Sequence, residues 1–259
     1  TDMNDGRIDV ETLSADLMGL EIRGGLKGQG VDFEKGKGSL DGNIAVVSKD
    51  LGILLRSAGQ ADLAKSVKSF ELGAGIKGSL SDLTVTPLTL TAMVKGPGAK
   101  KPVSLKVSAA EARANLDKDT LTLKGLSVAG LGLNAKANLD AKNISKEPTF
   151  SGNLDVPVFN LRKLLASLNQ PVPKTSDRKA LTKVGLSSDF GGSNTSFNLD
   201  NLKIGLDGTK LTGNVNVANF TGPDLKFNID IDRIDADRYM EPAPKGKVKA
   251  ASPEAAAAG

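Results

Sequence analysis

The feature that most constrains this chain is an alternation of apolar and polar residues with a period of two. It is clearest over 103–107, 131–139 and 225–231, where apolar side chains take every second position. Successive side chains of a β-strand point to opposite faces, so this period predicts strands with one apolar and one polar face. The segments between the strands are too short for crossover helices, which favours antiparallel pairing.

Glycine-containing dipeptides separate several of these strands. Asp41-Gly42 and Asp207-Gly208 are typical of tight hairpin turns, and we predict one at each position. The segment 73–78 fits the pattern G-x-G-x-x-G of dinucleotide sites. Such a site needs a helix directly after the glycines, whereas the following residues alternate as a strand. We therefore interpret 73–78 as a glycine-rich strand or hairpin.

Helical spacing is confined to short pieces. We predict a helix near 50–58 that begins at Asp50, a possible second one over 61–70, and a clearer one near 160–169 that is capped by Asn160. The segment 176–179 matches the S-x-x-K spacing of a serine beside a lysine base. Its partner motifs are absent from the sequence, so we expect a short helix capped by Thr175 or Ser176.

The strand-and-helix pattern recurs along the chain. The segment from Gly42 to Leu55 corresponds in order to the segment from Gly152 to Leu165, 110 positions later. Duplication of a strand–helix unit predicts a lengthwise-extended sheet, and chance similarity among Gly- and Leu-rich strands is the alternative. We expect a first β region over 1–145, a second over 146–240, and a flexible Ala/Pro/Lys linker over 241–259.

Composition excludes several classes of function. The 259 residues include no histidine and no cysteine. Ser-His-Asp triads and zinc sites built on imidazole or thiolate are therefore impossible for this chain, and we expect a non-enzymatic protein without cofactor or metal. The net charge of +4 and an aromatic share of 3% are not typical of a nucleic-acid binder, so we expect no nucleic-acid partner.

Four aspartates near the C-terminus are a candidate metal or carboxylate site. They are Asp230, Asp232, Asp235 and Asp237. The first two alternate with isoleucines, and the spacing is not that of a calcium-binding loop. We therefore place Asp230 and Asp232 on the water-facing side of a strand.

An apolar sheet face must be covered by something, and the short helices can cover only part of one this long. A second sheet, closure of the sheet on itself, or an apolar ligand could supply the rest. The residues that we predict to line a possible lipid groove are aliphatic or aromatic strand positions. They are Leu121, Leu123, Leu131, Leu133, Phe197, Leu199, Leu211, Val215, Phe227 and Ile229.

A family resemblance rests on four segments in order, 159–165, 174–181, 202–213 and 230–239. Together they resemble the AsmA family of bacterial envelope proteins. The resemblance implies a periplasmic region of a protein that is held in the inner membrane by an N-terminal anchor outside this fragment. It also implies a part in outer-membrane biogenesis, since the larger family members look like bridges that carry phospholipid along a hydrophobic groove.

These observations lead to one expected architecture and two possible functions. We expect a mainly β fold, an elongated and curved antiparallel sheet with two or three short helices. The preferred function is a non-enzymatic periplasmic module that supports outer-membrane assembly and transports phospholipid along a β groove. The alternative is a structural or protein-interaction module of the envelope that pairs with other envelope proteins and carries no lipid.

Overall fold

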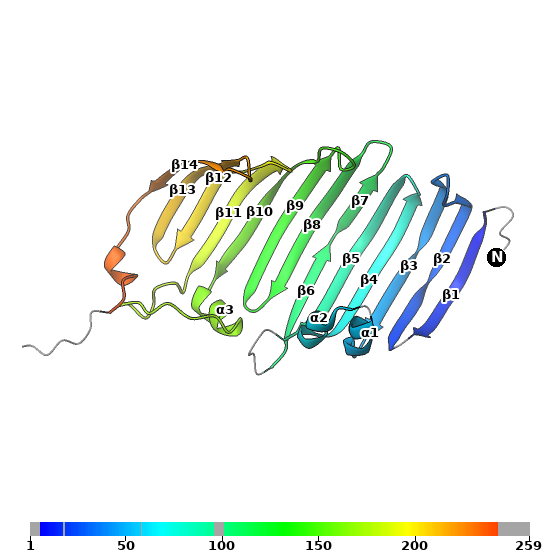
Figure 1. Ribbon diagram of the computed structural model, residues 1–259, viewed down its shortest axis with the longest axis horizontal. Helices are drawn as coiled ribbons and strands as arrows, with labels where there is room; N and C mark the ends of the chain where they lie inside the picture. The colour runs from blue at the N-terminus through cyan, green and yellow to red at the C-terminus, as the bar shows by residue number, and fades with distance from the viewer. Residues whose placement is uncertain (1–5, 18, 58, 96–100, 243–259) are drawn as a thin grey trace, which may run out of the picture.

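The computed structural model describes residues 6–17, 19–57, 59–95 and 101–242, and its fold is mainly β (Figure 1). Within these residues a single sheet contains 14 strands. Its outline is elongated and partly ring-like, which confirms the predicted fold class. The strands are β1 (Ile8–Leu17), β2 (Leu20–Asp32), β3 (Lys37–Ser48), β4 (Val67–Ser79), β5 (Asp82–Val94), β6 (Val103–Ala109), β7 (Glu111–Asn115), β8 (Thr120–Gly130), β9 (Leu133–Lys142), β10 (Thr149–Phe159), β11 (Val184–Ser193), β12 (Ser196–Leu206), β13 (Thr209–Ala218) and β14 (Asp224–Ile231).

The topology is the simplest that an antiparallel sheet can have, because each strand pairs with the next one along the chain. The one variation is that β6 and β7 lie end to end and share the position between β5 and β8. Strands in a sheet lie about 4.8 Å apart, so the 13 positions from β1 to β14 span about 58 Å. The sheet is therefore a long ribbon whose strands run across its width.

The helices lie along one edge of this ribbon, the lower edge in Figure 1. The first two, α1 (Gly52–Ser57) and α2 (Ala61–Ser66), join β3 to β4, and α3 (Leu161–Ser167) follows β10. A short 3₁₀ helix, η2 (Ala236–Arg238), follows β14 at the same edge. The opposite edge carries the turns that join β2 to β3, β4 to β5 and β7 to β8. No helix in the described part of the chain covers the middle of either sheet face.

Deep burial is rare in this fold. Among the described residues the buried hydrophobic side chains are Leu51, Ala64, Ala109, Ala141, Ala180 and Leu202. The chain exposes 17594 Å², whereas a compact protein of 26.8 kDa exposes about 10,800 Å². A single layer of strands explains the rarity of buried side chains and contributes to the large exposed area, because it leaves two broad faces open where a sandwich would hide one.

Several predictions of local structure are confirmed. Asp207-Gly208 is the tight turn between β12 and β13, and 73–78 lies in strand β4. The helices predicted near 50–58 and 160–169 are α1 and α3, and Asn160 caps α3 by accepting a hydrogen bond from the backbone N–H of Lys163 at 2.9 Å.

Asp41-Gly42 was expected to be a turn, and that prediction is wrong because both residues lie inside β3. A Cβ on Gly42 would lie 2.2 Å from the carbonyl oxygen of Gly25 on the neighbouring strand. Glycine is needed there to let β2 and β3 approach one another, and a bend plays no part.

Three other local predictions need correction. Leu131 lies in the β8–β9 turn with φ of 56°, not in a strand, because Leu131 and Gly132 reverse the chain there. The second helix ends at Ser66, since the alternating residues from Val67 onward pair with β5 as strand β4. Residues 176–179 form a turn and no helix, because the Asp177 carboxylate accepts the backbone N–H of Lys179 at 2.8 Å.

The two predicted β regions, 1–145 and 146–240, are parts of one continuous sheet. The expected boundary after residue 145 falls in the turn between β9 and β10, and these two strands are hydrogen-bonded to each other. A strand followed by a helix occurs both at β3–α1 and at β10–α3, but α2 has no counterpart after α3. The internal repeat stays a prediction, and the linker predicted over 241–259 lies, from residue 243, outside the described residues.

Candidate functional site

The strand register collects the apolar residues of the whole ribbon on one face, which we call the apolar face. Each strand alternates, and each pairing brings apolar positions opposite apolar positions. One continuous row of directly paired residues crosses the sheet from β1 to β14 without a polar side chain. It consists of Val10, Leu26, Gly42, Ile76, Val85, Ala112, Leu123, Leu139, Gly152, Phe190, Leu199, Val215 and Phe227.

A second apolar row runs beside the first, two residues further along each strand. It too crosses every position of the sheet with only aliphatic, aromatic or glycine residues. It consists of Ile8, Gly28, Leu40, Gly78, Leu83, Ala114, Leu121, Ala141, Phe150, Gly192, Phe197, Val217 and Leu225. The two rows form an uninterrupted hydrocarbon track along the ribbon.

The row between these two shows the opposite composition, because it points to the other side of the sheet, which we call the polar face. Its members are charged, hydroxyl, amide or glycine residues from end to end. They are Asp9, Lys27, Asp41, Lys77, Thr84, Arg113, Thr122, Asp140, Ser151, Gly191, Asn198, Asn216 and Lys226. A shift of one residue in any pairing would place polar residues in the apolar rows. Because the rows contain none, the registers of all pairings from β1 to β14 agree.

Side chains on the apolar face shield one another only from the side. Leu123, Leu139 and Val215 are half-buried, although each lies among apolar neighbours. At the edge strand β14 the exposure is larger, 67% for Phe227 and 56% for Leu225. Since monomeric proteins rarely leave large continuous apolar patches open to water, we take the apolar face as the candidate functional surface.

Aromatic residues are grouped in one part of the apolar face. The ring centroid of Phe150 lies 6.5 Å from that of Phe190 and 6.4 Å from that of Phe197. These separations are typical of favourable tilted ring pairs, which hold the side chains of β10, β11 and β12 in place.

The predicted groove residues are placed as follows. Leu121, Leu123, Phe197, Leu199, Val215 and Phe227 belong to the two apolar rows, and Leu133, Leu211 and Ile229 share their face through pairs with Gly130, Ile204 and Gly213. Leu131 alone lies outside the strands.

The predicted groove residues include none from the N-terminal half of the track. Its members Val10, Leu26, Ile76 and Val85 alternate with a period of two, but bulges interrupt that period in β1, β4 and β5. A search for alternation that allowed a one-residue slip would have found them.

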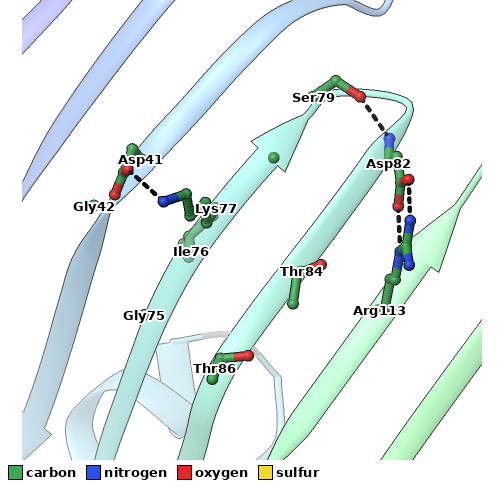
Figure 2. A pocket seen from close by; sticks show the side chains of 11 residues that line it. Asp41, Gly42, Gly75, Ile76, Lys77, Ser79, Asp82, Thr84, Thr86 and Arg113 are labelled. Atoms are coloured by element: carbon green, nitrogen blue, oxygen red, sulfur yellow. Dashed lines mark hydrogen bonds and ion pairs between the residues drawn. The ribbon is translucent and has the colours of Figure 1, made fainter.

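A hollow of ≈ 700 Å³ on the polar face is shown in Figure 2. It lies over β4 where Gly75 leaves space, and its charged groups are paired with one another. Lys77 Nζ lies 3.6 Å from an Asp41 carboxylate oxygen, and Arg113 Nε donates to Asp82 Oδ1 at 2.7 Å (Figure 2). The guanidinium hydrogen bond lowers the pKa of Asp82. The site offers a ligand no unpaired charge among these residues.

Carboxylates with perturbed pKa values elsewhere in the described chain also have structural roles. The backbone N–H of Lys210 donates to Asp232 and lowers the pKa of that carboxyl group. Burial raises the pKa of Asp207, but hydrogen bonds from the N–H groups of 181–183 outweigh burial and lower it. A general acid would need a raised pKa, which neither group shows.

The aspartates near the C-terminus do not gather into a metal site among the described residues. Asp230 lies in β14 opposite Thr212 on the polar face, as predicted. The same prediction is wrong for Asp232, which lies beyond the end of β14, where its carboxylate accepts the backbone N–H groups of Lys210 and Arg233. Within the described residues no group of three or more acidic side chains could hold a metal ion. The helices in the same residues are all too short to span a bilayer.

In comparisons with protein-family models, curated proteins and solved structures, the chain matches none. The resemblance to the AsmA family therefore stays a prediction from the sequence. The class that the fold and face define is a single-layer antiparallel β ribbon with one apolar and one polar side.

Proposed function

We propose that this chain is a non-enzymatic lipid-handling module whose apolar face holds the acyl chains of phospholipids. The observation that supports this most is the pair of unbroken apolar rows from β1 to β14, which lie on one face of a single sheet with no described helix over its middle. A face made of aliphatic side chains with few rings and no charge offers similar contacts at every position. Such a face suits sliding of a hydrocarbon chain better than recognition of one fixed ligand.

The energetic reason for such a face is the cost of moving lipid through water. Each methylene exposed to water costs about 0.8 kcal/mol, so two acyl chains with about 30 methylenes cost about 24 kcal/mol. An apolar surface that accepts the chains removes most of this cost without any reactive group. The track is about 58 Å long, which exceeds the roughly 30 Å hydrocarbon core of a bilayer.

The location and larger role belong to the same proposal. We place the chain in the bacterial periplasm, as part of a protein anchored in the inner membrane that supports outer-membrane assembly. This placement rests on the resemblance of segments within 159–239 to the AsmA family. The segregated faces support it, because a ribbon in an aqueous space needs one side in water and one side against lipid.

The test combines lipid identification with transfer. Native mass spectrometry of the purified protein should show bound phospholipid, and the protein should speed the movement of a fluorescent phospholipid between vesicles. A variant with Leu139→Asp and Val215→Asp places charge in one apolar row on β9 and β13. We expect it to lose transfer, while Asn134→Asp with Asn216→Asp, on the polar face of the same strands, keeps it.

Failure to fold is separated from failure to transfer by a milder pair, Leu139→Thr with Val215→Thr. Threonine favours strands, so this variant should keep the far-UV circular dichroism of the parent and still lose part of the transfer rate. Absence of lipid from the purified parent, together with no acceleration of transfer, would contradict the proposal.

A second candidate is the structural or protein-interaction module. It is favoured by β14, an edge strand whose Leu225, Phe227 and Ile231 are 56%, 67% and 49% exposed. Edge strands offer unpaired backbone groups to a strand of another protein. A stable protein complex that protects β14 from hydrogen exchange, formed by protein free of lipid, would favour this alternative.

A further inference from the structure

A cluster of positive charge lies at the edge of the ribbon, in the segment 160–183 that joins β10 to β11, which we call the α3 connection. Its exposed cations are Lys163, Lys174, Arg178, Lys179 and Lys183. None of the five makes an ion pair with any residue that the structure describes.

The acidic residue of this segment, Asp177, is already engaged. It lies 2.8 Å from the guanidinium of Arg238 and accepts the backbone N–H of Lys179. Of the five exposed cations, Lys179 lies near this carboxylate and helps to lower its pKa, and the α3 connection contains no further acidic residue for the other four.

The α3 connection is held in a defined shape. Arg162 donates to the carbonyl oxygen of Pro173 and to Thr175 Oγ1, both at 3.1 Å, and so ties the start of α3 to the loop after it. The carboxylate of Asp207 accepts the backbone N–H groups of 181–183 from the β12–β13 turn. Because the backbone is fixed from both sides, binding an anionic surface does not require the α3 connection itself to become ordered.

The opposite edge of the ribbon does not share this charge. In the β2–β3 turn Lys35 is paired with Asp32 at 2.9 Å. The turn 116–119 carries Lys118 between two aspartates, and the turn 143–148 carries Lys146 beside Glu147. On the helix-bearing edge, the α3 connection carries six basic residues and one acidic one. The nearby acidic residues belong to the segment 235–241, which hydrogen-bonds to Ser176 and Asp177.

We infer that the α3 connection docks on the surface of an anionic bilayer by binding lipid phosphate groups. Lysine and arginine near such a surface each contribute attraction, and several together hold a protein there. The partly exposed Leu168, at 39%, follows α3 and adds an apolar contact beside the charges. Nucleic acid is disfavoured because the segment 160–183 contains no aromatic residue on which a base could stack.

This docking is independent of the proposed lipid handling, since the cations lie on a connection at the sheet edge and the acyl chains would lie on the strands. It also gives the ribbon an orientation, with the helix-bearing edge toward the membrane surface.

The experiment is vesicle co-sedimentation with the whole chain. The probes are vesicles of phosphatidylcholine alone and vesicles that also contain phosphatidylglycerol. The parent protein should bind the anionic vesicles more tightly, and the preference should vanish at about 1 M salt, where charges are screened beyond about 3 Å.

A fourfold variant tests the residues, with Lys163→Gln, Lys174→Gln, Lys179→Gln and Lys183→Gln. Each lysine near an anionic surface is worth about fivefold in binding, which for four independent lysines is about 600-fold. Because neighbouring charges are not additive, the variant should bind anionic vesicles at least about 50-fold more weakly. The matched control changes Lys106, Lys136, Lys142 and Lys203 to Gln, which alters net charge equally on exposed strand positions. It should keep binding within about threefold, since distant charges are screened.

Equal binding by the two fourfold variants would overturn the inference, because the preference would then come from net charge. Displacement of anionic vesicles by a single-stranded DNA oligonucleotide at equal phosphate concentration would overturn it in favour of nucleic acid. The fourfold variant should still contain co-purified phospholipid by native mass spectrometry. If the purified parent protein contains no phospholipid, that result counts against the proposed lipid handling, and the docking result is unaffected.

Discussion

The carboxylate of Asp207 fixes the helix-bearing edge of the ribbon at its C-terminal end, and its removal gives the sharpest test of the structure. Its two oxygens accept backbone N–H groups of Leu181 at 2.6 Å, Thr182 at 3.0 Å and Lys183 at 3.0 Å. The hydroxyl of Tyr239 donates to the same carboxylate at 3.2 Å. One side chain thus joins the β12–β13 turn, the α3 connection and the segment after β14.

The magnitude follows from these bonds. A hydrogen bond to a charged acceptor contributes about 1.5–3 kcal/mol when buried, and we take about 1 kcal/mol each because Asp207 is only half-buried and water can replace part of the loss. The variant Asp207→Ala loses all four bonds, about 4 kcal/mol, and also places alanine at φ of 57°, which costs about 1 kcal/mol, so we expect about 5 kcal/mol lower stability. The variant Asp207→Asn keeps one oxygen and should lose about 1.5 kcal/mol.

Urea unfolding followed by circular dichroism measures the effect. With a slope of about 2.5 kcal/mol per M, Asp207→Asn should lower the midpoint by about 0.6 M without changing the slope. The control is Asp230→Asn, an exposed aspartate on the polar face of β14, which should stay within about 0.5 kcal/mol of the parent.

The pH dependence provides a second readout. Hydrogen bonds lower the pKa of Asp207 below the ordinary value of 3.8, so the folded state binds its proton less readily than the unfolded state. The stabilisation is therefore complete above about pH 5 and is lost as pH falls through 3.8 toward the folded value. The difference between the parent and Asp207→Asn should narrow between pH 6 and pH 3. A difference below about 0.5 kcal/mol at pH 7, or one that does not change with pH, would refute this account.

Two further predictions concern the sheet itself. Gly152→Ala should lower stability by about 2–3 kcal/mol in urea unfolding, because its Cβ would lie 2.0 Å from the carbonyl oxygen of Asn138. The control is Gly205→Ala, whose Cβ would meet nothing within 4 Å and which should leave stability unchanged. Equal losses of stability in the two variants would contradict the close approach of β9 and β10. Ser48→Ala should raise stability by about 1 kcal/mol, because the buried Ser48 hydroxyl, at 2% exposure, has no hydrogen-bond partner among the described residues. Ser188→Ala, which removes hydrogen bonds to the carbonyl oxygens of Asp189 and Asp200 at 2.7 and 2.8 Å, should instead lower stability by about 1 kcal/mol; a loss at Ser48 would mean that its hydroxyl is paired.

Strand content, antiparallel pairing and the helices near 50–58 and 160–169 were predictable from the sequence, because each rests on local chemistry. Alternation with a period of two depends only on which residues are neighbours, and Asn160 caps α3 through an atom three residues away. Asp207-Gly208 forms a turn for a similar local reason, since both residues tolerate the backbone that a tight reversal needs.

Residues whose roles depend on a neighbouring strand were misjudged. The same Asp-Gly dipeptide at Asp41-Gly42 lies inside β3, because the carbonyl oxygen of Gly25 approaches too closely for any side chain at Gly42. Leu131 continues the alternation of β9 in sequence, yet it turns the chain, because β8 pairs with β9 from Gly130 onward. No local pattern contains the position of the partner strand.

The amino-acid sequence by itself determined that each strand would have one apolar side and one polar side, because alternation is a property of consecutive residues. Only the tertiary structure decided that the apolar sides of all the strands would lie on the same face of the sheet. Agreement requires the registers of every pairing from β1 to β14 to match, with bulges in β1, β2, β4, β5, β8, β10 and β12 absorbing the local slips in alternation. Register is set by contacts between strands, and that is why the continuous apolar track emerges from the fold and not from any one segment.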